Sequence, residues 1–384
     1  MLAGKSNAAS GDIVTSDEVQ PDRFRLAAAM PDPAARRGRG ATANPTGRHE
    51  PTRRERFADG WDRDEAPARL RTEVVPERSR RIITRNASPD LGFDRSINPY
   101  RGCEHGCVYC FARPNHAHLG LSPGLDFETR LFAKPDAAML LERELSARGY
   151  RPATIALGTA TDPYQPVERE HRITRAVLEV LARFRHPVGI VTKSDLVLRD
   201  LDLLAPMAAQ GLVRVAVSLT TLDPVLARRM EPRAVRPGRR VETIRALAAA
   251  GIPVSVLMAP VIPGLNDHEI EAVLAAAREA GAVAAGSTLL RLPHELADLV
   301  RDWFAEHYPG KAERVFALVA DTRGGGTYDA AFGRRFTGTG PYAEMIARRV
   351  RLARVRLGYP AAVAPLRTDL FAVPREAGPQ LSLF

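Results

Sequence analysis

From about residue 95 onward, hydrophobic and polar positions follow one repeating arrangement: a short apolar run, a polar loop, and a stretch with apolar residues at helical spacing. The apolar runs have the length and the β-branched content of buried strands. They are Ile97–Arg101, Ala153–Leu157, Val188–Thr192, Val213–Leu219, Pro253–Ala259 and Ala285–Arg291. The other stretches predict helices. These cover Asp136–Arg148, Glu168–Phe184, Leu196–Ala209, Arg239–Ala250, Asp267–Ala280 and Leu296–Glu306.

Strand-and-helix units that follow one another in this way predict an α/β fold with a parallel sheet and helices outside it. Gly251 and Gly281 each lie just past a predicted helix, where a residue in the left-handed conformation commonly ends the helix. Such a chain forms either a doubly wound sheet or an incomplete barrel, and the periodicity does not choose between them. In a barrel, the polar residues that follow the strands meet at one rim.

The chain on either side of this repeat lacks the pattern. Residues 1–90 mix alanine, arginine, proline, glycine and acidic residues without an apolar period, which is typical of a disordered leader. Trp61 and Val74–Val75 are its candidates for contact with a folded core. We expect residues 91–310 to form the α/β domain, 311–375 an extension packed on it, and 376–384 a flexible tail.

Composition excludes some classes of protein. The longest apolar stretch, Ile252–Leu265, contains Pro253, Pro260 and Pro263, so it predicts a buried strand and no membrane span. The first thirty residues lack the continuous apolar stretch of a signal peptide, which favours a cytoplasmic protein. The formal net charge of +10 is compatible with a polyanionic partner such as DNA, but charge alone does not establish one.

The only three cysteines of the chain, Cys103, Cys107 and Cys110, lie close together. Thiolates at a C-x3-C-x2-C spacing on a short loop can close around a metal centre. Because the window holds no fourth cysteine, an iron–sulfur cluster bound there would keep one iron open to an outside ligand. Zinc is the alternative metal, and its fourth ligand would be a histidine. The candidates for that ligand are His105, His116 and His118.

The run of Cys103, Cys107, Tyr109 and Cys110 resembles the signature of the radical S-adenosylmethionine superfamily. Further along, Gly158–Glu168 resembles the branch related to spore photoproduct lyase. The resemblance implies a partial (β/α)6 barrel, similar to a TIM barrel, over residues 91–310. It also implies a [4Fe-4S] cluster on the three cysteines, S-adenosylmethionine at the open iron, and an electron donor such as flavodoxin or ferredoxin.

The resemblance also implies which residues contact S-adenosylmethionine. Thr159, Thr161 and Asp162 lie in the segment that meets the methionine amine, although Thr161 also fits as a helix cap. Lys193 would meet the carboxylate as a point charge, or it is a solvated surface lysine. The remaining candidates are Ser218 for the ribose, and Ile262, Gly264 and Tyr109 for the adenine.

Three features concern the substrate and partners. Spore photoproduct lyase uses a further cysteine to return a hydrogen atom, and this chain has none, so Tyr164 is the candidate donor. Glu231–Arg233 and Arg236 resemble a segment of the same branch that could face a polyanion. Gln380–Phe384 resembles the short motif by which bacterial DNA-processing proteins bind the replication sliding clamp.

Together these observations predict a radical S-adenosylmethionine enzyme that abstracts a hydrogen atom. Nucleic acid, in repair or modification, is the candidate substrate. The first alternative is the same chemistry on a protein or a metabolite. The second is a non-catalytic module whose cysteines hold zinc or an iron–sulfur cluster. No residue pattern identifies a catalytic residue beyond the cofactor ligands.

Overall fold

The central sheet of the structure, a computed structural model, is built from the apolar runs of the sequence. The structure describes residues 33–34, 36–50 and 69–374. Within them, six strands run parallel, and their spatial order matches their order along the chain. They are β3 (Arg95–Ile97), β6 (Ile155–Leu157), β7 (Val188–Thr192), β8 (Val213–Ser218), β9 (Val254–Val261) and β10 (Ala284–Leu289).

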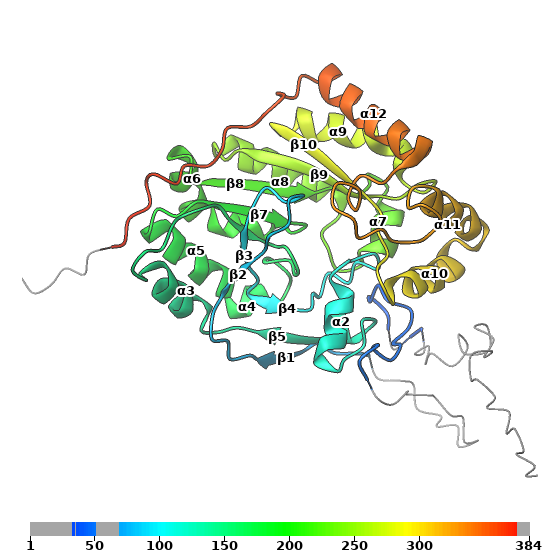
Figure 1. The fold of residues 1–384 in the computed structure, drawn as a ribbon, viewed down its shortest axis with the longest axis horizontal. Coiled ribbons are helices and arrows are strands. Elements are labelled where there is room, and N and C mark those ends of the chain that lie inside the picture. The colour runs from blue at the N-terminus through cyan, green and yellow to red at the C-terminus, as the bar shows by residue number, and fades with distance from the viewer. Residues whose placement is uncertain (1–32, 35, 51–68, 375–384) are drawn as a thin grey trace, which may run out of the picture.

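Helices lie outside this sheet, at the places where the sequence predicts them but with shifted ends (Figure 1). They are α3 (Ala137–Leu145), α5 (Ile173–Arg183), α6 (Leu201–Ala209), α8 (Pro237–Ala249), α9 (Ile270–Glu279) and α10 (Leu296–His307). The helix expected at Glu168–Phe184 is broken, because Arg172 has a φ of 51° and separates α4 (Glu168–His171) from α5. Parallel strands with helices outside form a partial (β/α)6 barrel, which confirms the expected fold class.

The described part of the barrel sheet does not close on itself. One edge is β10, and the other is β2 (Ile83–Arg85), which runs antiparallel to β3. Segment 333–336 lies between these edges. The carbonyl oxygen of Phe336 accepts from the N–H of Leu289 at the end of β10, and Arg335 forms an ion pair with Asp90 at 2.8 Å. The barrel is therefore bridged, at this gap, by a loop that contacts the end of β10 and the loop between β2 and β3.

A second, smaller sheet supports the cysteines. It consists of β1 (Glu73–Pro76), β5 (Arg130–Ala133) and β4 (Tyr100–Arg101), with β5 in the centre. The short helix α2 (Asp126–Thr129) leads into β5, and β4 leads into the cysteine loop. This sheet was not expected, because its strands are short and β1 is largely exposed, so the apolar pattern that identifies a strand is missing.

Part of the segment expected to be a disordered leader is folded against this region. The N–H groups of Gly40 and Ala41 both donate to the buried carboxylate of Glu128, at 2.8 Å each. Both β1 and β2 also fall within residues 1–90. The structure therefore differs from that expectation over 36–50 and 69–90. The physical reason is that polar contacts to Glu128 and strand pairing hold a segment that has no apolar period.

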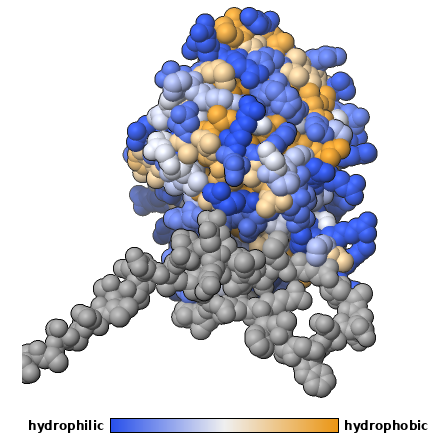
Figure 2. All heavy atoms as spheres, turned by 90° about the vertical axis from the view of Figure 1, so that its right-hand side faces the viewer, coloured by the Kyte–Doolittle hydropathy of each residue, from blue (hydrophilic) through white to orange (hydrophobic). Residues whose placement is uncertain are grey.

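The chain after the barrel packs on it in two places. Helix α11 (Ala312–Asp321) joins α10 in a hydrophobic cluster, and α12 (Gly340–Arg356) packs on α9 and β10. Over α10 and α11 the surface is mostly hydrophilic, with scattered hydrophobic residues (Figure 2). No helix in the described ranges is long and apolar enough to cross a membrane. Trp61 and Gln380–Phe384 lie outside the described residues, so docking of Trp61 and clamp binding stay predictions.

Candidate active site

The cysteines lie on a tight loop between β4 and the 3-10 helix η2 (Arg113–Leu119). Backbone hydrogen bonds turn this loop twice, from the N–H of Gly106 to the oxygen of Cys103 and from the N–H of Cys110 to the oxygen of Cys107. Gly106 has a φ of 66°, in the left-handed region that favours glycine. A Cβ there would lie 2.6 Å from an oxygen of the Glu128 carboxylate. The loop therefore requires glycine at this position.

A fully buried ion pair supports the cysteine loop. Nη2 of Arg113 lies 2.5 Å from Oε1 of Glu128, and Nε of Arg113 donates to the carbonyl oxygen of Cys107 at 2.8 Å. The same carboxylate accepts from Gly40 and Ala41, so the leader segment and the cysteine loop share one anchor. Buried charges are tolerated only when they are paired and hydrogen-bonded. This pair could not be expected from the sequence, because neither residue belongs to a recognisable motif.

A cavity of about 600 Å³ adjoins the cysteine loop at the carboxyl ends of the barrel strands. This volume is typical of sites for small molecules and cofactors. All three cysteines line the cavity, together with side chains that end or follow the other strands. The lining residues from β6, β7, β8, β9 and their following loops are Gly158–Asp162, Val191–Lys193, Ser218, Leu257, Ala259 and Pro260.

Most of the residues expected to contact S-adenosylmethionine lie along this cavity. They are Tyr109, Thr159, Thr161, Asp162, Lys193 and Ser218. Ile262 and Gly264 are not among its lining residues. Ile262 is buried in the hydrophobic cluster with α10 and α11, and Gly264 lies against Leu318 of α11. The cavity is reached instead by Ala259 and Pro260, because the chain turns away from it after β9.

Asp162 joins three parts of the cavity wall. Its carboxylate accepts from the hydroxyl of Thr192 at 2.7 Å and from the N–H of Lys193 at 2.8 Å, and Nδ1 of His105 lies 3.2 Å away. Burial alone would raise the pKa of Asp162, but the charge of His105 and these hydrogen bonds outweigh it and lower the pKa to about 2. Asp162 is therefore an anion at neutral pH that ties the cysteine loop to the loops after β6 and β7.

Lys193 and Tyr109 lie beside a second buried carboxylate, that of Glu231. The Lys193 ammonium is 5.9 Å from the centre of the Tyr109 ring, and the Tyr109 hydroxyl donates to Glu231. Arg240 forms an ion pair with Glu231, and Thr220 donates to it at 2.8 Å. Burial alone would raise the pKa of Glu231, but Arg240 and Lys193 lower it to about 2. Glu231 is 1% exposed, so the expectation that it faces a substrate is wrong.

Arg233 and Arg236, which were also expected to face a polyanion, lie on the surface. Arg233 is partly exposed and forms an ion pair with the buried Glu104 at 2.9 Å. Glu104 in turn accepts from the hydroxyl of Thr72. Arg236 is exposed at the start of α8. Neither arginine lines the cavity beside the cysteines.

The thiols share a cavity but do not converge as ligands of one ion. Among the described residues, no three His, Cys, Asp or Glu come close enough to hold a single metal ion. The candidate zinc ligand His116 instead contacts the carbonyl oxygen of Arg130 at 3.0 Å. A [4Fe-4S] cluster uses one iron for each thiolate and can leave its fourth iron open, which matches three cysteines without a fourth. Burial raises the pKa of Cys107 to about 12, so binding a cluster there must release protons.

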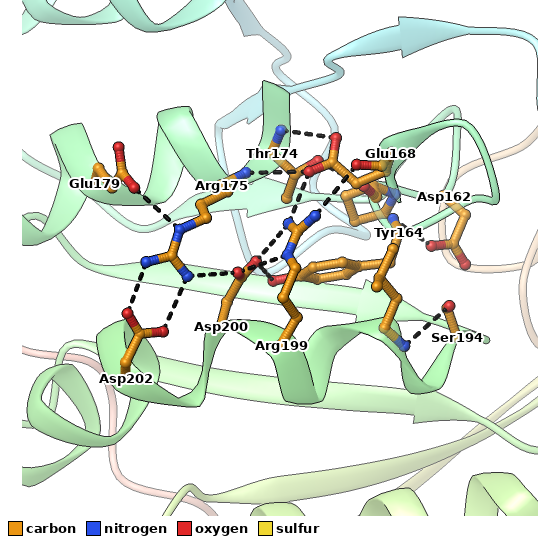
Figure 3. Close-up of polar contacts among 12 residues, drawn as sticks. Asp162, Tyr164, Glu168, Thr174, Arg175, Glu179, Ser194, Arg199, Asp200 and Asp202 are labelled. Carbon is orange, nitrogen blue, oxygen red and sulfur yellow. Dashed lines mark hydrogen bonds and ion pairs between the residues drawn. The ribbon is translucent and has the colours of Figure 1, made fainter. Parts of the chain in front are cut away.

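Tyr164, the candidate hydrogen donor, does not reach the cavity. Its hydroxyl donates to Asp200 at 3.1 Å inside a network of charged side chains (Figure 3). Arg199 pairs with both Asp200 and Glu168 at 2.8 Å, and Arg175 pairs with Asp200 at 2.9 Å. Burial raises the pKa of Tyr164 well above its usual value. The interpretation of Tyr164 as a donor is therefore wrong, because its side chain reaches from the loop after β6 to the 3-10 helix η3 (Asp195–Asp200).

Phenylalanine and arginine side chains line another part of the cavity, and the sequence analysis missed them. Phe111 follows the third cysteine, and Arg291 comes after β10. Arg335 and Phe336 belong to the segment that bridges the gap in the barrel. Only Phe111 carried a signal, since it adjoins Cys110. The others lie far away in sequence and fall in no motif.

Comparison with known proteins identifies the family. The model of the radical SAM superfamily matches residues 97–277. The uncharacterized protein Rv2578c of Mycobacterium tuberculosis is 36% identical over 292 residues, which are 75% of this chain and 82% of that protein. The uncharacterized protein MJ0683 of Methanocaldococcus jannaschii is 26% identical over 202 residues, which are 51% of this chain and 71% of that protein.

The fold is also similar to that of a protein of known structure. The solved structure of spore photoproduct lyase complexed with dinucleoside spore photoproduct matches with a TM-score of 0.54. The match covers 74% of this chain and 79% of that chain at 14% identity, so the likeness concerns the fold. With the cysteine spacing, the partial barrel and the family match in agreement, the chain belongs to the radical S-adenosylmethionine superfamily of enzymes.

Proposed function

We propose that Cys103, Cys107 and Cys110 hold a [4Fe-4S] cluster and that S-adenosylmethionine binds in the adjoining cavity. The observation that carries this proposal is that all three thiols and the polar strand ends line one cavity. When bound, the pair supplies a 5′-deoxyadenosyl radical by reductive cleavage, with an electron from a donor such as flavodoxin or ferredoxin. That radical would take a hydrogen atom from the substrate and become 5′-deoxyadenosine, leaving a substrate radical. A cluster held by free thiolates suits the reducing cytoplasm.

Some residues of the cavity would contact the cofactor, and others hold the cavity wall in position. Lys193 offers an ammonium group for the cofactor carboxylate, and its pKa is raised because Cys107 and Glu231 outweigh the lowering effect of burial. Ser218 lines the cavity, and we assign its hydroxyl to the ribose. Asp162 already accepts hydrogen bonds from Thr192 and Lys193. We therefore assign Asp162 the role of orienting the cavity wall, rather than that of a direct contact with the amine.

We propose nucleic acid as the substrate. Three observations support it: the formal net charge of +10, the arginines along the cavity, and the shared fold with spore photoproduct lyase, which has been solved with dinucleoside spore photoproduct. The chain has no cysteine besides the three of the loop, and Tyr164 faces Asp200. The proposal therefore does not include return of the hydrogen atom through a protein thiol.

The test is an electron paramagnetic resonance spectrum of the anaerobically reconstituted, reduced protein with and without S-adenosylmethionine. We expect a [4Fe-4S] signal that changes when the cofactor is added, and formation of 5′-deoxyadenosine under reducing conditions. Cys107→Ala should lose the signal, and Lys193→Met should weaken the response to the cofactor. Zinc in place of iron in the purified protein, with no such signal, would overturn the proposal.

A further inference from the structure

Five side chains form a ladder in which phenylalanine rings and arginine guanidinium groups alternate. In order they are Phe111, Arg291, Phe336, Arg335 and Phe332, and we call them the Phe–Arg ladder. The guanidinium carbon of Arg291 lies 4.2 Å from the ring centre of Phe111 and 4.7 Å from that of Phe336. The guanidinium carbon of Arg335 lies 4.7 Å from the ring centre of Phe336 and 5.1 Å from that of Phe332.

The ladder joins the cavity to the solvent. Phe111, Arg291, Arg335 and Phe336 line the cavity, and Phe332 lies beyond its lining. The two terminal rings are unusually accessible, since Phe111 is 46% exposed and Phe332 is 61% exposed. Exposed aromatic rings at the edge of a concave site typically mark a surface that binds a partner.

The ladder is assembled from three segments far apart in the sequence. Phe111 comes from the cysteine loop, Arg291 follows β10, and the other members come from residues 332–336. Segment 332–336 is held in place by the ion pair of Arg335 with Asp90 and by the contact of Phe336 with β10. The alternation is thus a product of the tertiary fold and does not follow from the periodicity of one helix or strand.

The charge in the ladder is not fully neutralised. Arg335 is paired with Asp90, but Arg291 forms no ion pair with a carboxylate in the described part of the chain. A guanidinium group between two rings, beside a cavity and with no carboxylate partner among the described residues, offers a site for an anionic group. Flat faces for stacking and a cation within reach are the two features that single-stranded nucleic acid requires.

We infer that the Phe–Arg ladder is a platform for single-stranded nucleic acid, with bases stacked on its rings and a phosphate near Arg291. This inference rests on the nucleic-acid substrate proposed above and names the residues that recognise it. Stacked bases inside an intact duplex are inaccessible to such a platform, so the target nucleotide must be unpaired or turned out of the helix. Because every base has a flat face, the platform binds with little preference for sequence.

The test measures the dissociation constant of a fluorescein-labelled single-stranded oligonucleotide by anisotropy, using the anaerobically reconstituted protein. Phe332→Leu and Phe111→Leu keep an apolar side chain but remove the stacking face. We expect each to weaken binding about fivefold to a hundredfold, the range measured for one base on one ring. An oligonucleotide made of abasic sites has no base that could stack. The variants and the unsubstituted protein should therefore bind it with equal affinity.

Salt dependence separates the roles of the rings and the arginine. Arg291→Gln should lower the slope of log binding constant against log salt concentration by about one, whereas Phe332→Leu should leave the slope unchanged.

Two matched controls lie elsewhere on the surface. Met139→Ala removes an apolar side chain of α3 that is 61% exposed, the same exposed fraction as that of Phe332. Arg348→Gln removes an exposed arginine of α12. We expect neither to change binding to the intact oligonucleotide.

The outcomes distinguish this inference from the proposed function. If the ladder variants contain as much iron as the unsubstituted protein but bind the oligonucleotide equally tightly, the ladder is not the platform and nucleic acid is bound elsewhere. If the unsubstituted protein binds no oligonucleotide, nucleic acid is not the substrate, and the inference fails with that part of the proposed function. Formation of 5′-deoxyadenosine in the absence of substrate tests the radical chemistry separately.

Discussion

At the scale of single residues, Gly158 connects β6 to the polar loop that holds Asp162. It has a φ of 91°, and a Cβ on it would lie 2.2 Å from the carbonyl oxygen of Val191. We expect Gly158→Ala to lower the free energy of unfolding by about 2 kcal/mol or more, because the backbone of β7 would have to move. Urea unfolding followed by circular dichroism measures this change.

Gly238→Ala is the control for that substitution. Gly238 lies in α8, and a Cβ there would meet nothing within 4 Å. Alanine favours helix over glycine by up to about 1 kcal/mol, so this change should leave stability the same or higher. Equal effects of the two substitutions would contradict the close approach of β7 to Gly158.

Glu231 provides a second prediction at this scale. Its carboxylate holds the hydroxyl of Tyr109 on the cysteine loop and the guanidinium of Arg240 on α8. Glu231→Gln leaves Arg240 buried without its counterion, so we expect a loss of about 3 kcal/mol in unfolding free energy. Glu242→Gln breaks an exposed pair with Arg239 and should have little effect. Thermal melts of both variants make the comparison, and similar melting temperatures would contradict it.

The residues of the candidate site could be predicted from the sequence where they lie in one short motif or at the end of a predicted strand. The cysteines are recognisable by spacing, and Lys193 and Ser218 by their position at strand ends. Arg291 and Phe336 could not be predicted, because they meet only after β10 and segment 333–336 come together. Gly264 belongs to a segment that resembles the adenine-contacting segment of the superfamily. It does not line the cavity, because the chain turns toward α11 after β9 ends at Val261.

At the scale of elements, Asp200 joins α5, η3 and the loop after β6. Its buried carboxylate accepts from Tyr164, Arg175 and Arg199 (Figure 3). We expect Asp200→Asn to destabilise the protein by about 3 kcal/mol, because two arginines lose part of their counter-charge. Denaturant unfolding measures the change.

The neighbouring Asp202 is a matched control for Asp200. It binds the same arginine, Arg175, at 2.7 Å, but its side chain is 56% exposed. Solvent screens an exposed pair, so Asp202→Asn should change stability far less. If the two substitutions destabilise equally, burial is not what makes the Asp200 network stable.

The elements were predicted best where the apolar pattern is strong. β7 has the bounds that the sequence predicts, Val188–Thr192, because all its residues except Gly189 are β-branched and a polar segment follows. The break at Arg172 was missed, because no glycine or proline marks it and the polar residues of α4 read as the first turn of the helix that follows. β1 was missed as well, since its stability comes from pairing with β5 and not from burial of its own side chains.

At the scale of the whole molecule, His186 makes stability depend on pH. It is fully buried between Tyr150 and Phe371, and burial lowers its pKa to about 4. The unfolded chain takes up a proton near pH 6.5, whereas the folded chain does not until about pH 4. Stability is therefore complete above pH 6.5 and falls as the pH drops toward 4, with about 2 kcal/mol lost at pH 5.

Substitution of His186 by glutamine tests this dependence. His186→Gln should lower stability at pH 7.5, because the ring contacts with Tyr150 and Phe371 are lost. The further loss between pH 7.5 and pH 5 should be smaller than in the unsubstituted protein by about 2 kcal/mol, because the titrating group is gone. Urea midpoints at the two pH values give the difference, and equal pH dependence would contradict the assignment to His186.

The gap in the barrel has a mechanical consequence. In a sheet closed into a ring by backbone hydrogen bonds, the wall opens only when two strands separate. Here Asp90, Arg335 and the Phe336 carbonyl form a clasp, and its release would break a few polar contacts without unravelling any strand. The mouth of the cavity can therefore widen at this gap while the parallel strands keep their pairing.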